Sequence, residues 1–175
     1  MINQTNEILI TEEQIKKRVD ELGSQITKDY AGEEVLLVGI LKGSVPFMAD
    51  LMRRINLDVE IDFMSVSSYG AGTTSSGEVK IKKDLDTDIA GKNVIIVEDI
   101  VDTGYTLSLL TKKLLERNPK SLKVCAALDK PARRLVDFKA DYVGFEVEDK
   151  FIVGYGLDAD QKFRHFPYIS WIKEE

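Results

Sequence analysis

Two short apolar runs, each followed by a helical pattern, constrain the fold of this chain most. Val35 to Ile40 is continuous and apolar, as in a strand covered on both faces, and a helical pattern resumes in residues 45–52. Asn93 to Val97 is a second run of this type, and residues 106–115 carry leucines at helical separations after it. Because strands that alternate with helices favour a parallel arrangement, we predict an α/β fold with a mostly parallel central sheet flanked by helices.

Other segments extend this plan. Thr11 begins a capping-box pattern, which predicts an amphipathic first helix. In residues 57–63 apolar residues alternate with Asp58, Glu60 and Asp62, which predicts a strand whose acidic face is wet. Further strands are predicted at residues 79–81, as the return of a hairpin, and at residues 124–128 and 142–145.

Size and composition exclude several classes of protein. The chain has 175 residues without an internal repeat or a Pro-rich linker, so one domain spanning residues 1–175 is expected. Its 24 basic and 30 acidic residues give a net charge of −6, which argues against nucleic acid as a partner. Cys125 is the only cysteine, so no intrachain disulfide forms, and no leader sequence or membrane-spanning run is recognisable. A cytoplasmic protein that does not bind membranes is expected.

The segment that joins the second apolar run to its helix carries the clearest chemical signal. Glu98, Asp99 and Asp102 crowd together, and such carboxylates repel one another unless they are wet, bonded to hydroxyl groups or near a metal. Thr103 to Thr106 follow at a helix start, where backbone N–H groups and the helix dipole can hold a phosphate. A sugar diol beside a phosphate would satisfy both groups. The simpler alternative is that Thr103 caps the helix and the acids are solvated.

Taken whole, Val94 to Leu107 closely resembles the phosphoribosyl-pyrophosphate (PRPP) motif of the type I phosphoribosyltransferases. Leu41-Lys42-Gly43 is similar to the pyrophosphate loop of the 6-oxopurine (hypoxanthine) branch of that family, and Lys130 is similar to its base-recognition lysine. The resemblance covers most of the chain, and its other markers follow in order as Ser68-Tyr69, Phe151 to Tyr155, Asp158 and Arg164. It implies the type I phosphoribosyltransferase fold, with a small hood made by the terminal segments and a flexible lid loop within Ser67 to Glu78.

The resemblance also implies a role for each marker. Asp102 would be the general acid or base near N7 of a purine, while Glu98 and Asp99 would bind the ribose hydroxyls. Lys130 would donate to the oxygen at C6 of the base, and Phe151, next to Ile152, would stack on it. The remaining assignments are Thr103, Gly104, Tyr105 and Thr106 to the 5′-phosphate, Lys42, Gly43 and Arg164 to pyrophosphate, Ser68 and Tyr69 to the lid, and Asp158 with Glu98 and Asp99 to Mg²⁺. In this family the peptide bond before Lys42 is cis.

The implied activity is purine salvage. It is the Mg²⁺-dependent transfer of the 5-phosphoribosyl group from PRPP to hypoxanthine, and to guanine, by a homodimer or homotetramer, giving IMP or GMP and pyrophosphate. One alternative is a relative that uses xanthine or another base. A second is a regulator on the same fold that binds PRPP or nucleotides and controls transcription; the acidic balance and Asp102 count against it. The single histidine, His165, cannot build a usual zinc site without cysteine partners, and no P-loop motif is present.

Overall fold

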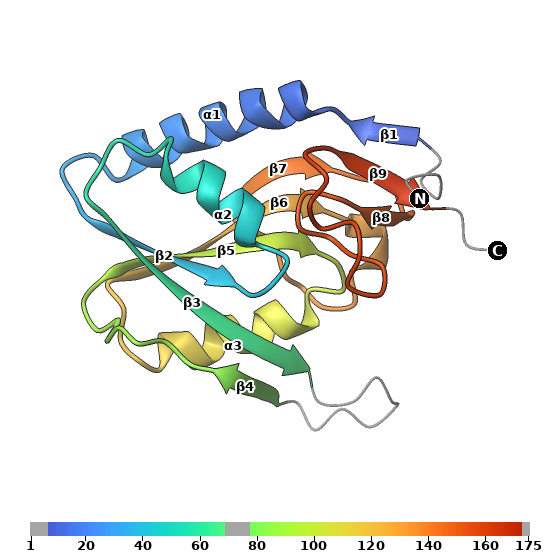
Figure 1. The fold of residues 1–175 in the computed structure, drawn as a ribbon. Helices are drawn as coiled ribbons and strands as arrows, with labels where there is room; N and C mark the ends of the chain where they lie inside the picture. Colours follow the sequence, from blue (N-terminus) through green and yellow to red (C-terminus); the bar gives the residue numbers. More distant parts are fainter. Residues whose placement is uncertain (1–6, 69–77, 173–175) are drawn as a thin grey trace.

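The computed structural model describes residues 7–68 and 78–172, and its centre is a six-stranded sheet (Figure 1). The strands pair in parallel except at one edge, where the outermost strand runs antiparallel to its neighbour. In spatial order they are β4 (Val79–Lys83), β3 (Val59–Ser68), β2 (Val35–Ile40), β5 (Asn93–Val101), β6 (Ser121–Asp129) and β7 (Tyr142–Glu146). This arrangement confirms the predicted α/β class and the hairpin return at the edge.

Helices cover both faces of the sheet, so that the central strands are buried (Figure 1). α1 (Glu12–Asp29) and α2 (Val45–Met52) lie on one face, and α3 (Tyr105–Leu115) lies on the other. α1 starts at the predicted capping box, in which Thr11 and Gln14 each accept a hydrogen bond from the other's backbone N–H. All six residues of β2 are buried, as its continuous apolar sequence predicted.

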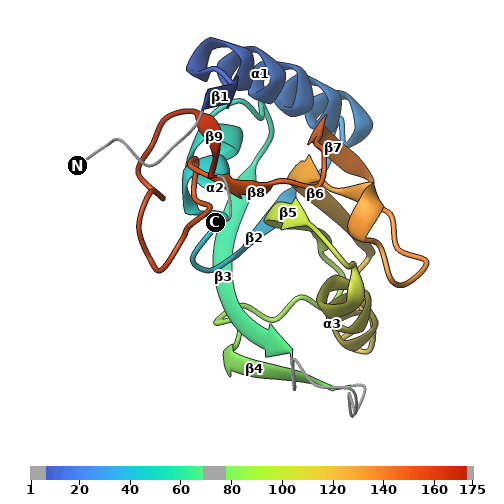
Figure 2. The ribbon, with the colours of Figure 1, turned by 90° about the vertical axis from the view of Figure 1, so that its right-hand side faces the viewer.

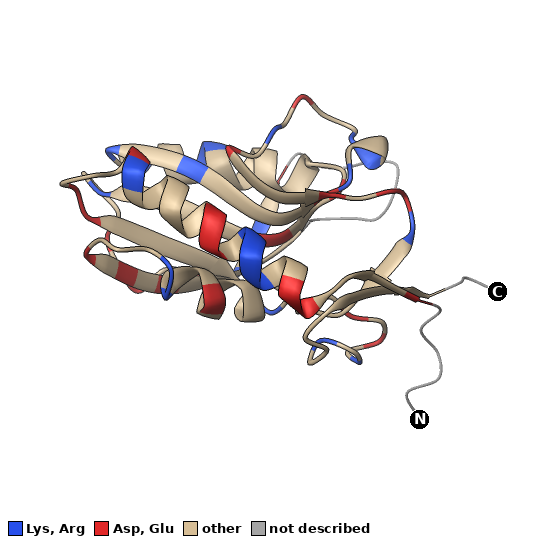
Figure 3. Ribbon diagram, turned by 90° about the horizontal axis from the view of Figure 1, so that it is seen from above, with Lys and Arg blue, Asp and Glu red and all other residues tan. Residues whose placement is uncertain are grey.

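The exposed face of α1 carries charges of both signs, with acidic and basic turns in succession (Figure 3). Lys16 and Glu12, for example, form an ion pair of 3.0 Å one turn apart on this face. Across the described parts of the chain, no helix has the length and apolar character that a membrane crossing needs.

A second, three-stranded antiparallel sheet forms a hood at the carboxyl ends of β5 and β6 (Figures 1 and 2). It consists of β1 (Glu7–Ile10), β9 (Ile169–Ile172) and β8 (Phe151–Val153), so both terminal segments contribute to it, as predicted. Ile10, Ile152 and Ile169 of the hood are buried in the same apolar cluster as residues of α1 and α2. This shared core fixes the hood above the sheet.

The strand predicted at residues 57–63 forms as part of β3, which begins at Val59, and two of its side chains differ from the predicted alternation. Asp62 was expected on a wet face, but it is only 7% exposed, whereas Ile61 is 46% exposed. The Asp62 carboxylate accepts hydrogen bonds of 2.9 Å from the backbone N–H groups of both Asp86 and Thr87. The loop after β4 therefore returns over this face and buries the acid, because it supplies the donors that a buried carboxylate requires.

Two further differences concern the site. β5 continues to Val101, so Glu98 and Asp99 lie within the strand and not in the loop after it. β5 pairs with β6 as far as Val101 opposite Asp129, and this pairing holds the acidic residues on a rigid element. The predicted lid lies largely outside the described residues, since Tyr69 is not described and Ser68 is the last residue of β3.

Candidate active site

The site-residue predictions fall mainly on the carboxyl ends of β2, β5 and β6 and on the hood facing them (Figure 2). Ligands of open parallel sheets bind at these strand ends, because the loops there converge on one edge. The hood closes this edge from above and adds β8 and the residues that follow it. Three groups of side chains can be distinguished there.

The first group is the loop between β5 and α3. Gly104 is the N-cap of α3, with φ of 78°, and no side chain caps the helix start. Thr103 therefore does not act as the N-cap, although its hydroxyl accepts a hydrogen bond of 3.2 Å from the Tyr105 N–H. In residues 7–68 and 78–172, no partner is found for the backbone N–H groups of Thr103 and Gly104. An uncapped helix start with available N–H groups is suited to an anion.

Glu98 and Asp99 lie just before this loop. Their carboxylates accept hydrogen bonds from the backbone, at 3.0 Å from Asp99 N to Glu98 and at 2.7 Å from Ile100 N to Asp99. Burial raises the pKa of Glu98 well above its ordinary value, and the adjacent Asp99 raises it further. Burial also raises the pKa of Asp99, although its bond with Glu98, the Ile100 amide and the charge of Arg164 act in the opposite direction. Ligands with hydroxyl groups or positive charge would stabilise such a pair.

The second group surrounds Gly43. The Leu41–Lys42 peptide before it is cis. A Cβ atom at Gly43 would lie 2.7 Å from Cγ of Asp99 and would overlap its carboxylate, so the acid packs directly on this backbone. On the other side, a Cβ atom at Gly156 would overlap the carbonyl of Gly43. Both glycines are thus required by close approach, and Gly156 also has a φ of +101°.

Asp158 and Arg164 are brought together beside this loop. Arg164 Nη2 lies 2.9 Å from the Asp158 carboxylate, and Nη1 donates to the carbonyl of Gly156 at 2.7 Å. Arg164 Nε is buried without a partner among the described residues. Gln161, which belongs to none of the sequence motifs, contacts both Arg164 at 3.2 Å and Lys42 Nζ at 3.4 Å. The residues assigned to pyrophosphate are therefore neighbours.

The third group lines a cleft of about 480 Å³ between the sheet and the hood. Lys130 is 7% exposed, and its ammonium donates to the Lys150 carbonyl at 2.8 Å. Phe151 is 41% exposed, so its ring is not part of the core, whereas Ile152 behind it is buried. The cleft is lined by Ile100, Asp102, Lys130, Arg133, Asp149, Lys150, Phe151, Ile152, Leu157 and Asp158.

Five residues of this cleft were not anticipated from the sequence, and two of them, Arg133 and Asp149, lie close to predicted site residues. Arg133 Nε lies 3.3 Å from the Asp102 carboxylate, and Arg133 Nη1 lies 3.5 Å from Asp149. Asp149 in turn lies 3.9 Å from Lys130 Nζ. The only sequence signal was the pair of arginines shortly after Lys130, and such pairs are common on exposed loops.

The metal assignment involves residues from both sides of the site. In the part of the chain that the structure describes, no three acidic, histidine or cysteine side chains cluster closely enough to hold an ion by themselves. Glu98, Asp99 and Asp158 can therefore supply only part of a coordination shell. Mg²⁺ typically retains waters and binds one or two carboxylates together with substrate phosphates.

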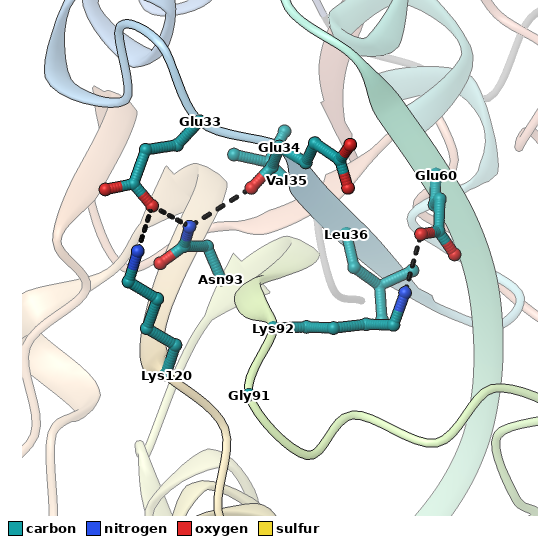
Figure 4. A pocket seen from close by; sticks show the side chains of 9 residues that line it. All are labelled: Glu33, Glu34, Val35, Leu36, Glu60, Gly91, Lys92, Asn93 and Lys120. Atoms are coloured by element: carbon teal, nitrogen blue, oxygen red, sulfur yellow. Dashed lines mark hydrogen bonds and ion pairs between the residues drawn. The ribbon is translucent and has the colours of Figure 1, made fainter.

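A second cavity, of about 260 Å³, lies at the opposite end of the strands, where β2 and β5 begin (Figure 4). Its two lysines are paired with glutamates, Lys120 with Glu33 and Lys92 with Glu60, each at 2.6 Å. Asn93 also donates to Glu33 at 2.6 Å. Because these groups satisfy one another, the cleft beneath the hood is the stronger candidate for an active site.

Comparisons with known proteins agree with this geometry. The phosphoribosyl transferase domain family matches residues 5–160. A hypoxanthine-guanine phosphoribosyltransferase of Bacillus subtilis is 51% identical over 173 residues, which are 99% of this chain and 96% of the relative. One of Streptococcus thermophilus is 54% identical over 168 residues, covering 96% and 93% of the two chains. A solved hypoxanthine phosphoribosyltransferase of Staphylococcus aureus superposes with a TM-score of 0.94 at 51% identity, covering 98% of this chain and 93% of that one.

The chain therefore belongs to the phosphoribosyl transferase family. Within that family it is an enzyme of the hypoxanthine-guanine phosphoribosyltransferase branch, since its relatives match over nearly their whole length. The resemblance inferred from the PRPP motif is confirmed at the level of the family and its type I fold.

Proposed function

We propose that the enzyme transfers the 5-phosphoribosyl group from PRPP to hypoxanthine or guanine, giving IMP or GMP and pyrophosphate. One observation carries the proposal: Asp102, Lys130 and Phe151 line a single cleft beside the uncapped start of α3. An exposed aromatic ring suits the face of a purine, and an ammonium suits its carbonyl oxygen. A carboxylate suits an N–H group of the same base.

In the proposed reaction the bond from C1′ to the pyrophosphate oxygen breaks and the bond from C1′ to N9 of the base forms. The proton on N7 passes to the Asp102 carboxylate as N9 becomes bonded to the sugar. Lys130 stabilises negative charge that develops on the oxygen at C6, because a buried ammonium interacts more strongly than an exposed one. No covalent intermediate with the protein is required, since positioning and charge stabilisation can lower the barrier to an oxocarbenium-like state.

The sugar phosphate would lie between β5 and α3. The N–H groups of Thr103 and Gly104, with the hydroxyls of Thr103 and Thr106, would hold the 5′-phosphate. Glu98 and Asp99 would accept hydrogen bonds from the ribose hydroxyls, which would satisfy a pair that burial otherwise disfavours in its charged form. Lys42, Gly43 and Arg164 would hold pyrophosphate.

The residues at hand fit Mg²⁺ as a partner of the substrate. Glu98, Asp99 and Asp158 are hard oxygen donors, and the raised pKa values of the first two are what a cation would lower. When bound, Mg²⁺ would neutralise charge on the leaving pyrophosphate. The protein residues would contribute by orienting the two substrates around it.

Three further proposals concern the protein as a whole. Residues 1–175 are proposed to form one domain, supported by the core that the hood shares with α1 and α2. A cytoplasmic location is proposed because Cys125 is the only cysteine and is buried as a free thiol. A homodimer or homotetramer is proposed from the family resemblance alone.

The test is an assay of the purified chain with PRPP, Mg²⁺ and a panel of hypoxanthine, guanine, xanthine, adenine and uracil. We expect nucleotide and pyrophosphate from hypoxanthine and guanine. Preferred use of xanthine would revise the base assignment. Binding of PRPP without product from any base would favour the regulator and overturn the proposal.

A further inference from the structure

Arg134 does not line the cleft, but it makes an unusual set of contacts directly behind the loop between β5 and α3. Its Nε donates to the carbonyl of Asp102 at 3.2 Å. Its Nη1 donates to the carbonyl of Phe138, and its Nη2 donates to the carboxylate of Asp129. The side chains of Arg134 and Asp129 are only 18% and 15% exposed. All three guanidinium nitrogens are therefore used within the protein, and the charge is paired.

This contact is one of three that bind the carbonyl groups of successive residues, from Val101 at the end of β5 to Thr103 in the loop. The carbonyl of Val101 accepts from the Lys130 N–H at 2.9 Å, and the carbonyl of Thr103 accepts from the Leu135 N–H at 2.9 Å. Arg134 supplies the donor for the carbonyl between them. Three consecutive carbonyl oxygens, which would repel a phosphate, are thus bonded to the segment from Lys130 to Leu135.

Gly104 makes this arrangement sterically feasible. A Cβ atom there would lie 2.9 Å from Cδ of Arg134 and 3.0 Å from Cβ of Phe138. The absence of a side chain lets the guanidinium reach past the helix start to the Asp102 carbonyl. The φ of 78° at the same residue belongs to a conformation that glycine adopts readily.

We infer that Arg134 is a positioning residue that fixes the loop from Asp102 to Gly104 in its phosphate-binding conformation. The inference rests on the proposed function, which assigns the 5′-phosphate to this loop. Arg134 does not line the cleft, so it acts through the loop. It orients the loop by holding the carbonyl of Asp102 from behind, with Asp129 as its counter-ion, so that the N–H groups of Thr103 and Gly104 stay available to the phosphate.

The test compares ligands with and without a phosphate in matched variants. In Arg134→Lys the charge and the aliphatic stem remain, but one ammonium cannot reproduce a planar fork that reaches three acceptors. The matched control is Arg117→Lys, because Arg117 also forms a bidentate pair, with Asp84 at 2.8 Å to each oxygen, but packs at the far end of α3. Dissociation constants for IMP and for inosine are measured by calorimetry for each protein, together with the thermal unfolding midpoint.

We expect IMP binding to weaken roughly 10- to 100-fold in Arg134→Lys, as charged hydrogen bonds contribute about 1.5–3 kcal/mol and 1.4 kcal/mol is a factor of ten. Inosine binding should stay within about twofold, and Arg117→Lys should retain the wild-type ratio of the two affinities. In steady-state kinetics the KM for PRPP should rise in Arg134→Lys while the KM for hypoxanthine stays near its wild-type value.

The outcomes separate the two proposals. If the wild-type enzyme binds IMP no more tightly than inosine, the assignment of the 5′-phosphate to this loop fails, and with it the proposed function. If the wild type prefers IMP and Arg134→Lys keeps the same preference, Arg134 is only a structural residue and the inference is overturned. Should Arg134→Lys not fold, Asp129→Asn serves instead, because it retains the arginine and removes only its counter-ion. An unchanged IMP-to-inosine ratio in that variant would equally overturn the inference.

Discussion

Gly43→Ala should lower both activity and stability, and the structure sets the size of both effects. The new Cβ atom would lie 2.7 Å from Cγ of Asp99, whereas carbon atoms in contact prefer about 3.5–4.0 Å. The carboxylate must therefore recede by about 1 Å. Rotation of the Asp99 side chain away from the new atom would relieve the strain, and this breaks the 2.7 Å hydrogen bond from Ile100 N. Losing a hydrogen bond to a charged group costs about 2 kcal/mol of stability.

The effect on catalysis should be larger, because a displacement of about 1 Å in a positioned group can reduce the rate on the order of 10²-fold. We expect kcat/KM for PRPP to fall by about that factor, measured by initial rates with hypoxanthine at saturation. The control is Gly91→Ala, at a position with a φ of +73° and open space around it. That variant should lose about 1 kcal/mol of stability and keep its activity. Activity of Gly43→Ala within twofold of the wild type would refute the placement of Asp99 at the reacting sugar.

Three other predictions concern a proton, a base and a buried acid. Asp102→Asn should bind PRPP normally and lose 10²–10⁴-fold in turnover, about what general acid–base assistance supplies; unchanged turnover with hypoxanthine would remove Asp102 from the chemistry. The wild-type enzyme should use adenine poorly, because the Lys130 ammonium and the amino group of adenine are both hydrogen-bond donors. Lys130→Ala should lower the ratio of kcat/KM for hypoxanthine to kcat/KM for adenine. Efficient use of adenine by the wild type would contradict this role of Lys130. Asp62→Asn should cost about 2 kcal/mol at pH 7, because an amide oxygen that accepts from Asp86 and Thr87 leaves the N–H₂ group facing the Phe63 N–H, which donates to the other carboxylate oxygen. Burial alone would raise the pKa of Asp62, but the amides of Thr87, Phe63 and Asp86 outweigh it and lower the pKa. The acid therefore stabilises the fold at pH values above the ordinary aspartate pKa of about 3.9, and this contribution is lost as the pH falls through the lower, folded-state value. Urea unfolding at pH 7 and pH 3 should show the difference between wild type and Asp62→Asn shrinking at the lower pH; a constant difference would count against it.

The sequence was sufficient wherever neighbouring residues determine the structure. The continuous apolar run in β2 and the capping box of α1 depend on residues within one element, and both were predicted correctly. The expectation that the candidate site lies at the strand ends followed from the α/β class itself. The PRPP motif was recognisable because its acids, threonines and glycine lie within one short segment.

What the sequence could not provide depends on residues far apart in the chain. Asp62 is buried by a loop more than twenty residues later in the chain. Its alternation with apolar neighbours shows nothing of that loop and suggested that the side chain is exposed. Arg134 resembles an ordinary surface arginine until the fold brings it to the carbonyl of Asp102, 32 residues away. The end of β5 was placed too early because Glu98 and Asp99 are untypical of strands, yet pairing with β6 carries the strand to Val101.

The most direct test of the central claim is a crystal structure of the enzyme with IMP bound. We expect the 5′-phosphate within hydrogen-bonding distance of the Thr103 and Gly104 N–H groups and the ribose hydroxyls at Glu98 and Asp99. The base should lie against Phe151, with its C6 oxygen at Lys130 Nζ. A phosphate bound elsewhere, or a base outside the cleft beneath the hood, would contradict the central claim.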